Sequence, residues 1–238
     1  MPTVRYTSLE KLEVHRPVDR IGYLQQVCAG KVVLDLGAMD ETAFNRKRGT
    51  GSWLHEELGK VATMVWGVDN STTVPELGLR TGARSMIHRG DVHNLEEFVR
   101  THAIQPDIIV AGELIEHVPN PLELLQALVA APSLRGKTLV LTTPNATGLH
   151  NCLIGLTRRE ATHPDHLLIL SYKTLNTLFL RSGCQNWEIR TYHARFAEMK
   201  ESVTGVRRAL VGVGERMINT AETLWPLLSF GLIGRATL

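Results

Sequence analysis

The sequence predicts an α/β fold, in which a doubly wound, mostly parallel sheet of seven strands carries helices on both faces. Short runs rich in β-branched residues alternate with stretches of helical periodicity along the 238 residues. Parallel strands require such crossover helices, because each strand must return to the same edge of the sheet. A composition that is 43% hydrophobic and 21% charged is typical of a globular chain with a buried core.

Each predicted element follows from its own residues. The strands are predicted at 31–36, 62–68, 85–89, 107–111, 137–142, 187–192 and 229–237. The helices are predicted at 17–29, 52–60, 75–80, 94–102, 121–131, 146–159, 171–182 and 203–224. Pro121 suits a first helical turn, where its missing N–H costs little, and Gly183 ends the helix before it.

Two later segments carry more specific expectations. The segment 163–170 is predicted to be a loop or lid over the sheet. Helix 203–224 has apolar positions that either pack on the sheet or face a partner subunit, and we expect them to pack on the sheet. These positions are Leu210, Val211, Val213, Met217 and Ile218.

Charge and cysteine content exclude several classes of protein. A net charge of +2 gives the whole chain no general attraction to nucleic acid or to an anionic membrane, so a small molecule is the predicted partner. Cys28, Cys152 and Cys184 are too few and too widely spaced for a disulfide framework or a zinc site. Residues 1–17 lack the apolar core of a signal peptide, and no run spans a bilayer, so the predicted location is the cytoplasm.

Polar and small residues follow the predicted strands where a ligand of such a sheet would bind. Parallel sheets bind ligands beyond the carboxyl ends of their strands. Gly37 follows the first strand, and glycine lets a ligand approach the backbone closely. Asp69 ends the second strand, where a carboxylate can accept both hydroxyls of a ribose. Asp91 follows the third strand, where it can accept a hydrogen bond from an adenine amino group.

These segments resemble the class I S-adenosylmethionine-dependent methyltransferases, and especially the ubiquinone-type small-molecule methyltransferases. The matching segments are VVLDLGAMD (32–40), VWGVDNS (65–71), RGDVHNL (89–95), PDIIVAGELIEHVPNP (106–121) and LVLTTPN (139–145), with a weaker likeness over 163–183. The resemblance implies a Rossmann-like methyltransferase fold with S-adenosylmethionine as cofactor. It also implies a single domain, with an N-terminal helical cap (1–30), a cofactor-binding half (31–145) and a substrate-side half (146–238).

The resemblance assigns a role to each matching position. It places the methionine part of the cofactor against the first loop, the ribose at the second strand, the adenine after the third strand and the sulfonium above the fourth strand. The residues implied are, in that order, Asp35, Gly37 and Ala38; Asp69 and Asn70; Asp91 and Val92; and Ala111, Gly112 and Glu113. A carboxylate in this last segment, such as Glu113 or Glu116, has the alternative role of charging the first turn of a helix.

One position departs from the family pattern. The first loop of the family reads Asp-x-Gly-x-Gly, and Met39 stands at its second glycine. The side chain of Met39 must therefore stay clear of the cofactor, and Gly49 and Gly51 are the alternative positions for a close approach. The basic run 45–48, which lies between Met39 and Gly49, is interpreted as a solvated loop rather than a substrate clamp. A methyltransferase-like partner protein without catalysis is the alternative hypothesis.

The catalytic prediction is methyl transfer to a hydroxyl oxygen of a small molecule, with an N- or C-acceptor as the alternative. Methyl transfer mainly requires the acceptor to be held in line with the methyl carbon, and a hydroxyl acceptor also needs a base. Histidine suits that role, and the candidates are His117 and His166, with a packing role as the alternative for His117. No metal is predicted, because His163 and His166 lack the i, i+4 spacing of a helical zinc site. A dehydrogenase is the rival class of enzyme, but it would normally show G-x-G-x-x-G, which this chain lacks.

Overall fold

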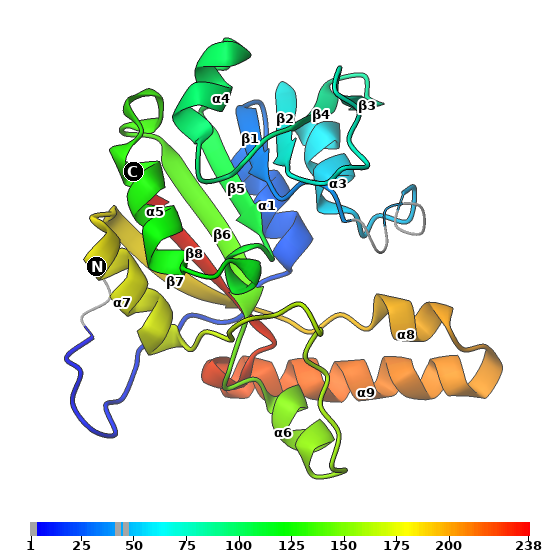
Figure 1. The fold of residues 1–238 in the computed structure, drawn as a ribbon. Helices are drawn as coiled ribbons and strands as arrows, with labels where there is room; N and C mark the ends of the chain where they lie inside the picture. Colours follow the sequence, from blue (N-terminus) through cyan, green and yellow to red (C-terminus); the bar gives the residue numbers. More distant parts are fainter. Residues whose placement is uncertain (1–3, 41–43, 45–47) are drawn as a thin grey trace.

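The computed structural model describes residues 4–40, 44 and 48–238, and its strands form one eight-stranded sheet (Figure 1). The order across the sheet is β3-β4-β2-β1-β5-β6-β8-β7. The strands are β1 (Val32–Leu36), β2 (Met64–Asp69), β3 (Leu79–Gly82), β4 (Ser85–Arg89), β5 (Ile108–Gly112), β6 (Thr138–Pro144), β7 (Gln185–Tyr192) and β8 (Gly231–Thr237). Strands β4, β2, β1, β5 and β6 pair in parallel, whereas β8 is antiparallel to both β6 and β7.

The predicted α/β fold is confirmed, and the predicted strand count of seven is one too low. The extra strand, β3, pairs antiparallel with the edge strand β4. The sequence analysis predicted a helix at 75–80, and that prediction was wrong. Pro75 and Gly78 form a turn there, with Gly78 at a φ of 85° and its N–H 2.9 Å from the Pro75 carbonyl oxygen. The chain after this turn pairs with β4, and this long-range pairing overrides local helical propensity.

Helices cover both faces of the sheet (Figure 1). They are α1 (Arg20–Cys28), α3 (Leu54–Val61), α4 (Leu95–Thr101), α5 (Pro121–Ala130), α6 (Leu149–Gly155), α7 (Tyr172–Ser182), α8 (Ala197–Glu201) and α9 (Gly205–Leu224), with short 3-10 turns η1 (Ile115–His117), η2 (Pro132–Leu134) and η3 (Pro226–Leu228). Buried side chains of α4, α5 and α7 share one core cluster, and those of α1 and α3 share another. The sheet is therefore doubly wound.

The central strands divide their side chains between these two cores. Leu34 and Leu36 of β1 belong to the cluster with α4, α5 and α7, whereas Val33 belongs to the cluster with α1 and α3. Ile109 and Val110 of β5 divide in the same way. Successive side chains of a strand point to opposite faces, so a strand buried on both sides is apolar throughout. This explains why KVVLDL and DIIVA are recognisable as strands.

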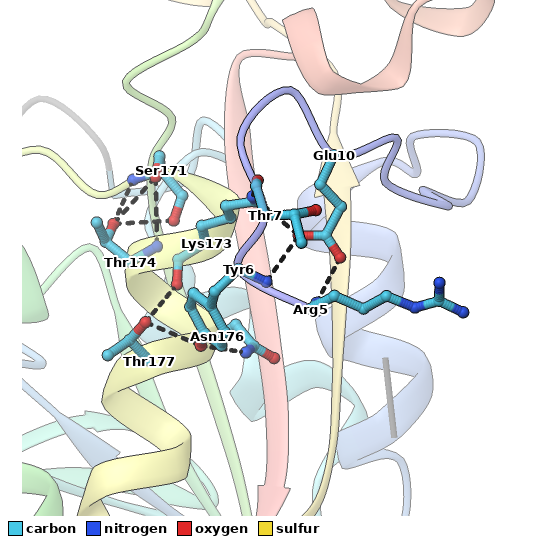
Figure 2. A network of polar contacts seen from close by, with 9 residues as sticks. All are labelled: Arg5, Tyr6, Thr7, Glu10, Ser171, Lys173, Thr174, Asn176 and Thr177. Atoms are coloured by element: carbon cyan, nitrogen blue, oxygen red, sulfur yellow. Dashed lines mark hydrogen bonds and ion pairs between the residues drawn. The ribbon is translucent and has the colours of Figure 1, made fainter. Parts of the chain in front are cut away.

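The N-terminal segment is a strap bound along α7, and among its described residues it is not helical before α1. The predicted helical cap at 1–30 is therefore helical only over Arg20–Cys28. Figure 2 shows the contacts: the side-chain amide of Asn176 donates to the Tyr6 hydroxyl (2.7 Å), and the Lys173 ammonium donates to the Thr7 carbonyl (3.2 Å). Lys173 also forms an ion pair with Glu10 at 2.9 Å, whose carboxylate accepts the Tyr6 N–H.

Helix α9 does not pack on the sheet, so the expectation for helix 203–224 was wrong. Its contacts are with α8, η3 and α6, and Figure 1 shows it well apart from the strands. Only Glu222 of the helix is buried, and its carboxylate accepts a hydrogen bond from the Ala194 N–H (3.2 Å). The side of α9 that faces the protein carries the half-buried Val211 and Ile218 beside its acidic residues, whereas Leu210, Val213 and Met217 are exposed.

Replacing Gly231 by alanine is expected to destabilise the protein by about 1–3 kcal/mol, because overpacking a full site forces its neighbours to shift. A Cβ atom on Gly231 would lie 2.0 Å from Cζ of Tyr192. Chemical denaturation checks the prediction, with Gly212→Ala as the matched control. A Cβ there meets nothing within 4 Å, and alanine is the better helix former. Equal stability of the two variants would contradict the packing argument.

Candidate functional site

The carboxyl ends of four adjacent strands meet at one edge of the sheet. Strands β4, β2, β1 and β5 are neighbours in that order. In their register, Leu36 pairs with both Val68 and Ala111, and Asp69 pairs with Arg89. Residues that follow these strands are therefore brought side by side, although they are far apart in sequence. The structure thus gathers the predicted residues Gly37, Ala38, Asp69, Asn70, Ala111 and Gly112 at one edge.

Two glycines at this edge are required by close contacts. Gly37 has a φ of 68°, in the left-handed region that favours glycine, and a Cβ there would lie 2.9 Å from Cδ1 of Leu114. A Cβ on Gly112 would lie 2.3 Å from Cδ2 of Leu54 and 3.2 Å from a guanidinium nitrogen of Arg20. A side chain at Gly37 would press on the loop after β5, and one at Gly112 would press on α3 and α1.

The Asp69 carboxylate is held by backbone groups of two loops. It accepts the N–H of Met39 at 2.8 Å and that of Ser71 at 2.9 Å. The side chain of Met39 is half-buried against the small core cluster that contains Trp53, and the indole of Trp53 donates to the Ala38 carbonyl (3.0 Å). The loop after β1 is therefore fixed to the end of β2 by its backbone, and the Met39 side chain is part of a packed cluster.

The described end of that first loop, residues 48–51, contacts α3. The Gly49 N–H donates to the Glu56 carboxylate at 2.8 Å, and Gly49 and Gly51 both have positive φ values, 72° and 77°. Of the basic run 45–48, residues 45–47 lie outside the described residues. Arg48 is exposed, and its guanidinium lies over the ring of Phe44 at 5.4 Å.

Asp35 has a protein partner rather than an open position. It is buried within β1, and its carboxylate lies 2.8 Å from Nδ1 of His55, which is also buried. Nε2 of His55 lies 3.0 Å from the hydroxyl of Thr81 in β3. The sequence analysis missed His55, because the first turn of a predicted helix gives no sign that a side chain crosses to a neighbouring strand.

The residues after β4 lie in a turn at the far side of the same edge. Asp91 is exposed, and its carboxylate accepts the N–H of His93 (2.9 Å), which is an Asx turn. Val92 is half-buried against the main core cluster, and it lines a cavity of about 270 Å³ between α4, α5 and η2. Asn70, after β2, is exposed.

Glu113 is the centre of a polar network that links β5, β6, β7 and α1. Its φ of 55° lies in the left-handed region, which is uncommon for a residue with a side chain and is a feature of functional sites. Its carboxylate accepts the hydroxyls of Thr142 (2.8 Å) and Tyr192 (2.9 Å), and lies 3.6 Å from Nε of Arg20. Arg20 and Tyr192 were not found from the sequence.

Burial and charge shift the pKa values of this network. Burial raises the pKa of Tyr192 well above its ordinary value, and the neighbouring Glu113 carboxylate adds to the rise. For Arg20, burial lowers the pKa, but Glu113 and other nearby acidic groups raise it, and the net direction is upward. The tyrosine therefore stays neutral and the arginine stays charged at neutral pH.

The two predicted catalytic histidines meet beyond the end of β5. The rings of His117, in η1, and His166, in the loop 163–170, have centroids 4.6 Å apart. The loop is attached to η1 by the Leu167 N–H, which donates to the Glu116 carbonyl at 2.9 Å. Burial lowers the pKa of His166, and the neighbouring His117 lowers it further. The segments that carry these histidines are almost fifty residues apart, and the fold brings them together.

Glu116 is buried between these histidines and Glu113. Its side chain is 0% exposed, and neither carboxylate oxygen has a hydrogen-bond partner among the residues that the structure describes. Burial raises its pKa to about 8, and the charge of Glu113 contributes to the rise. Glu116, His117 and His166 each offer one ligand atom, and these atoms lie within 4.8 Å of one another. One carboxylate and two imidazoles at this separation could hold a divalent metal ion.

The fold and the strand-end site define a nucleotide-binding α/β protein, and comparison with known proteins gives its family. The methyltransferase domain family matches residues 26–189. The chain therefore belongs to this family, as its resemblance to methyltransferases predicted. The chain is 30% identical over 133 residues to a ubiquinone biosynthesis O-methyltransferase from Actinobacillus pleuropneumoniae, a match that covers 52% of this chain and 51% of that protein. The chain spans about half the length of the curated relatives it matches.

Solved structures of methyltransferases share the fold. A SAM-dependent methyltransferase from Archaeoglobus fulgidus superposes with a TM-score of 0.51 at 14% identity, over 92% of each chain. A SAM-dependent methyltransferase from Thermotoga maritima, described as a possible histamine N-methyltransferase, superposes with a TM-score of 0.53 at 13% identity, over 91% of this chain and 86% of that one. At these identities the likeness confirms the fold alone. Among the described residues, no helix is long and apolar enough to cross a membrane.

Replacing His55 by alanine is expected to destabilise the protein by about 3 kcal/mol, because it leaves the buried Asp35 carboxylate without this partner. Thermal and denaturant unfolding measure the loss, and the exposed His93 provides the matched control, His93→Ala. A loss below about 1 kcal/mol for His55→Ala would show that Asp35 does not depend on this contact.

Proposed function

We propose that the chain transfers a methyl group from S-adenosylmethionine to a hydroxyl oxygen of a small-molecule acceptor in the cytoplasm. The observation that carries this proposal is the pair His117 and His166, which lies beyond β5 beside the strand ends where the cofactor is expected. The match to ubiquinone biosynthesis O-methyltransferases over half the chain supports an oxygen acceptor. The net charge of +2 supports a small acceptor rather than a nucleic acid.

The residues at the sheet edge fit an adenosyl cofactor. Asp69 presents a carboxylate at the end of β2, oriented by the N–H groups of Met39 and Ser71, at the position where a carboxylate can accept the hydroxyls of a ribose. Gly37 and Gly112 keep the approach free of side chains. Ala38, Asn70, Asp91, Val92, Ala111 and Glu113 complete the proposed cofactor-binding set. The bound cofactor supplies an activated methyl group with its own leaving group.

Asp35 has a different part in this proposal from the one that the resemblance implies. Its carboxylate is bonded to His55 and buried. We therefore propose that Asp35 positions the loop after β1, through His55 and α3, rather than contacting the methionine part directly.

His117 has the geometry of a base. Its Nδ1 lies 3.2 Å from the Asp165 carbonyl oxygen, which can only accept a hydrogen bond. Nδ1 therefore carries the proton, and the lone pair of the neutral ring is at Nε2. His166, with its lowered pKa, is neutral at neutral pH and is the second candidate for accepting the proton of the acceptor hydroxyl.

A bound cation is the second candidate for activating the acceptor. It is favoured by the two carboxylate oxygens of Glu116, which are buried without a partner among the described residues. Bound by Glu116, His117 and His166, a divalent metal ion would lower the pKa of an acceptor hydroxyl by direct contact. An N- or C-acceptor is the further alternative, since a neutral amine attacks without a base.

Asp69→Ala is expected to weaken the binding of S-adenosylhomocysteine about 10- to 100-fold, because a charged hydrogen-bond acceptor is worth about 1.5–3 kcal/mol. Isothermal titration calorimetry measures the affinities of the wild type and the variant. Glu76→Ala removes an exposed carboxylate in the turn after β2 and should bind as the wild type does.

No binding of S-adenosylmethionine or S-adenosylhomocysteine by the folded wild type would overturn the cofactor proposal and favour a non-catalytic partner protein. Equal affinities of the wild type and Asp69→Ala would instead reject only the assignment of Asp69.

His117→Gln and His166→Gln are expected to lower methyl transfer to hydroxylated acceptors, one of them by about 10²- to 10⁴-fold, because general-base catalysis contributes that much. The assay uses labelled S-adenosylmethionine with a panel of small hydroxylated and amine acceptors, and the methylated atom is identified by mass spectrometry. His93→Gln is the control. Near-full turnover in both variants, or products methylated only at nitrogen, would reject the base and the oxygen acceptor.

Treatment with a chelator distinguishes catalysis by a histidine base from catalysis by a bound metal ion. If histidine acts alone, prolonged treatment with EDTA leaves turnover unchanged. If a cation serves, EDTA abolishes turnover, Mg²⁺, Mn²⁺ or Zn²⁺ restores it, and Glu116→Gln weakens binding of that ion in calorimetry, because one of three ligands is lost.

A further inference from the structure

Apolar side chains are exposed mainly on one part of the molecule, formed by α6, α8, α9 and the segments between them. This part lies below the sheet in Figure 1. Fourteen large hydrophobic residues are exposed in the described chain. Eleven of them belong to residues 149–225, and without Leu180 of α7 ten remain on this part of the molecule. They are Leu153, Leu156, Leu167, Met199, Val206, Leu210, Val213, Met217, Leu224 and Trp225. Such a concentration differs from the scattered exposed apolar residues of an ordinary surface.

Helix α9 orders half of these side chains into one stripe. Val206, Leu210, Val213, Met217 and Leu224 recur at spacings of three, four and seven residues, so they share one face of the helix. Each is between 51% and 77% exposed. A helix of twenty residues is about 30 Å long, and the stripe runs along nearly all of it. Trp225 follows directly at its end and is also exposed.

The charges of α9 are separated across the helix. Arg207, Arg208 and Arg216 are exposed, and none of them forms an ion pair with another described residue. At 100° per residue, Arg207 and Arg216 lie about 90° to either side of the apolar stripe. Long basic side chains in such positions can extend to the level of a charged surface on which the stripe rests.

The acidic residues of α9 point the other way. Glu215 forms an ion pair with Lys200 (2.7 Å), and Glu222 lies 2.9 Å from Nδ1 of His193. Both acids are thus bound to the protein itself. The outer side of α9 is consequently apolar along its centre, with one arginine on each border, Arg207 and Arg216. Arg208 lies on the opposite side of the helix, with the acidic residues.

We infer that α9 docks on the surface of an anionic phospholipid bilayer, with its stripe in the headgroup region and its arginines at the lipid phosphates. An apolar face bordered by basic residues is the pattern of helices that lie in a membrane interface, and tryptophan is enriched at that depth. The sequence analysis predicted no membrane partner from a net charge of +2. That average does not reveal the separation of charge across α9.

A second copy of the chain is a poorer occupant of this face. The middle of the stripe falls at about residue 215, so an antiparallel pairing of α9 with itself places the two copies of Arg216 on the same side of the interface at nearly the same level. Like charges at such positions are destabilising. A bilayer with anionic lipids offers the complementary charge along both borders of the stripe, at about 1 kcal/mol for each basic residue.

Vesicle flotation of the full chain tests the inference without any enzymatic readout, so it is independent of the proposed function. The probes are vesicles of phosphatidylcholine alone and of phosphatidylcholine with phosphatidylglycerol. We expect binding to the anionic vesicles, weakened by salt, and a blue shift of Trp225 fluorescence on binding. Leu210→Asp with Met217→Asp should abolish binding, and Arg207→Gln with Arg216→Gln should weaken it about fivefold for each arginine.

Matched controls are Leu77→Asp and Arg135→Gln, which change exposed residues outside this part of the molecule. Circular dichroism verifies that every variant is folded. Three results would overturn the inference: no binding to anionic vesicles, binding that the α9 variants leave unchanged, or a dimer in light scattering that Leu210→Asp with Met217→Asp dissociates while no variant binds vesicles.

Discussion

The turn of the chain at Glu113 is the feature on which the rest of the site depends. The left-handed backbone there, which costs of the order of 1–3 kcal/mol in strained residues, directs the chain from β5 into η1. The same residue accepts hydrogen bonds from the sixth and seventh strands and lies beside Arg20 of α1. A local strain is thereby offset by contacts from three separate parts of the fold. Those contacts fix where η1, and with it Glu116 and His117, can lie.

The same geometry brings acidic groups together at an energetic cost. Glu116 is buried next to another carboxylate, and its pKa is raised to about 8, so its charge is disfavoured in the folded protein. Buried polar atoms normally have hydrogen-bond partners, and groups that depart from this rule gather at functional sites. The two carboxylate oxygens of Glu116 can therefore accept a hydrogen bond from a ligand, take up a proton or bind a cation.

The sequence predicted most of the sheet, because its central strands are buried on both faces and are therefore continuous apolar runs. It also predicted which residues follow the strands. Because the strands pair in parallel, their carboxyl ends lie at one edge of the sheet, and these residues are brought together there. It could not predict β3, since a four-residue edge strand is determined by pairing with β4 rather than by its own composition. The position of α9 was missed because amphipathic periodicity shows that a helix has an apolar face, but not whether the protein covers it.

The site itself was predictable only where chemistry follows a strand directly. His117 and His166 were selected from the sequence because each is close to a strand end or the loop above it. The structure places their rings 4.6 Å apart, and their catalytic role stays a prediction. His55, Arg20 and Tyr192 act across the fold, through contacts between residues that are 20 to 93 positions apart in the sequence. Residue type and spacing give no signal for such contacts. For the same reason, the sequence could not show that the partner of Asp35 is His55 rather than a ligand.

The position of β8 imposes an order on how the sheet is completed. β8 follows β7 along the chain, yet it lies between β6 and β7 and pairs with both. During synthesis β7 consequently emerges before the strand that pairs along its length, with only the short bridge between Tyr192 and Val18 available to it. The edge of β6 remains open until residues 231–237 have been made. Open strand edges are templates for association with other chains, and pairings between distant segments form slowly. A nascent chain of this protein thus passes through an interval in which its half-built sheet is exposed to intermolecular pairing, and its last inserted strand closes that interval.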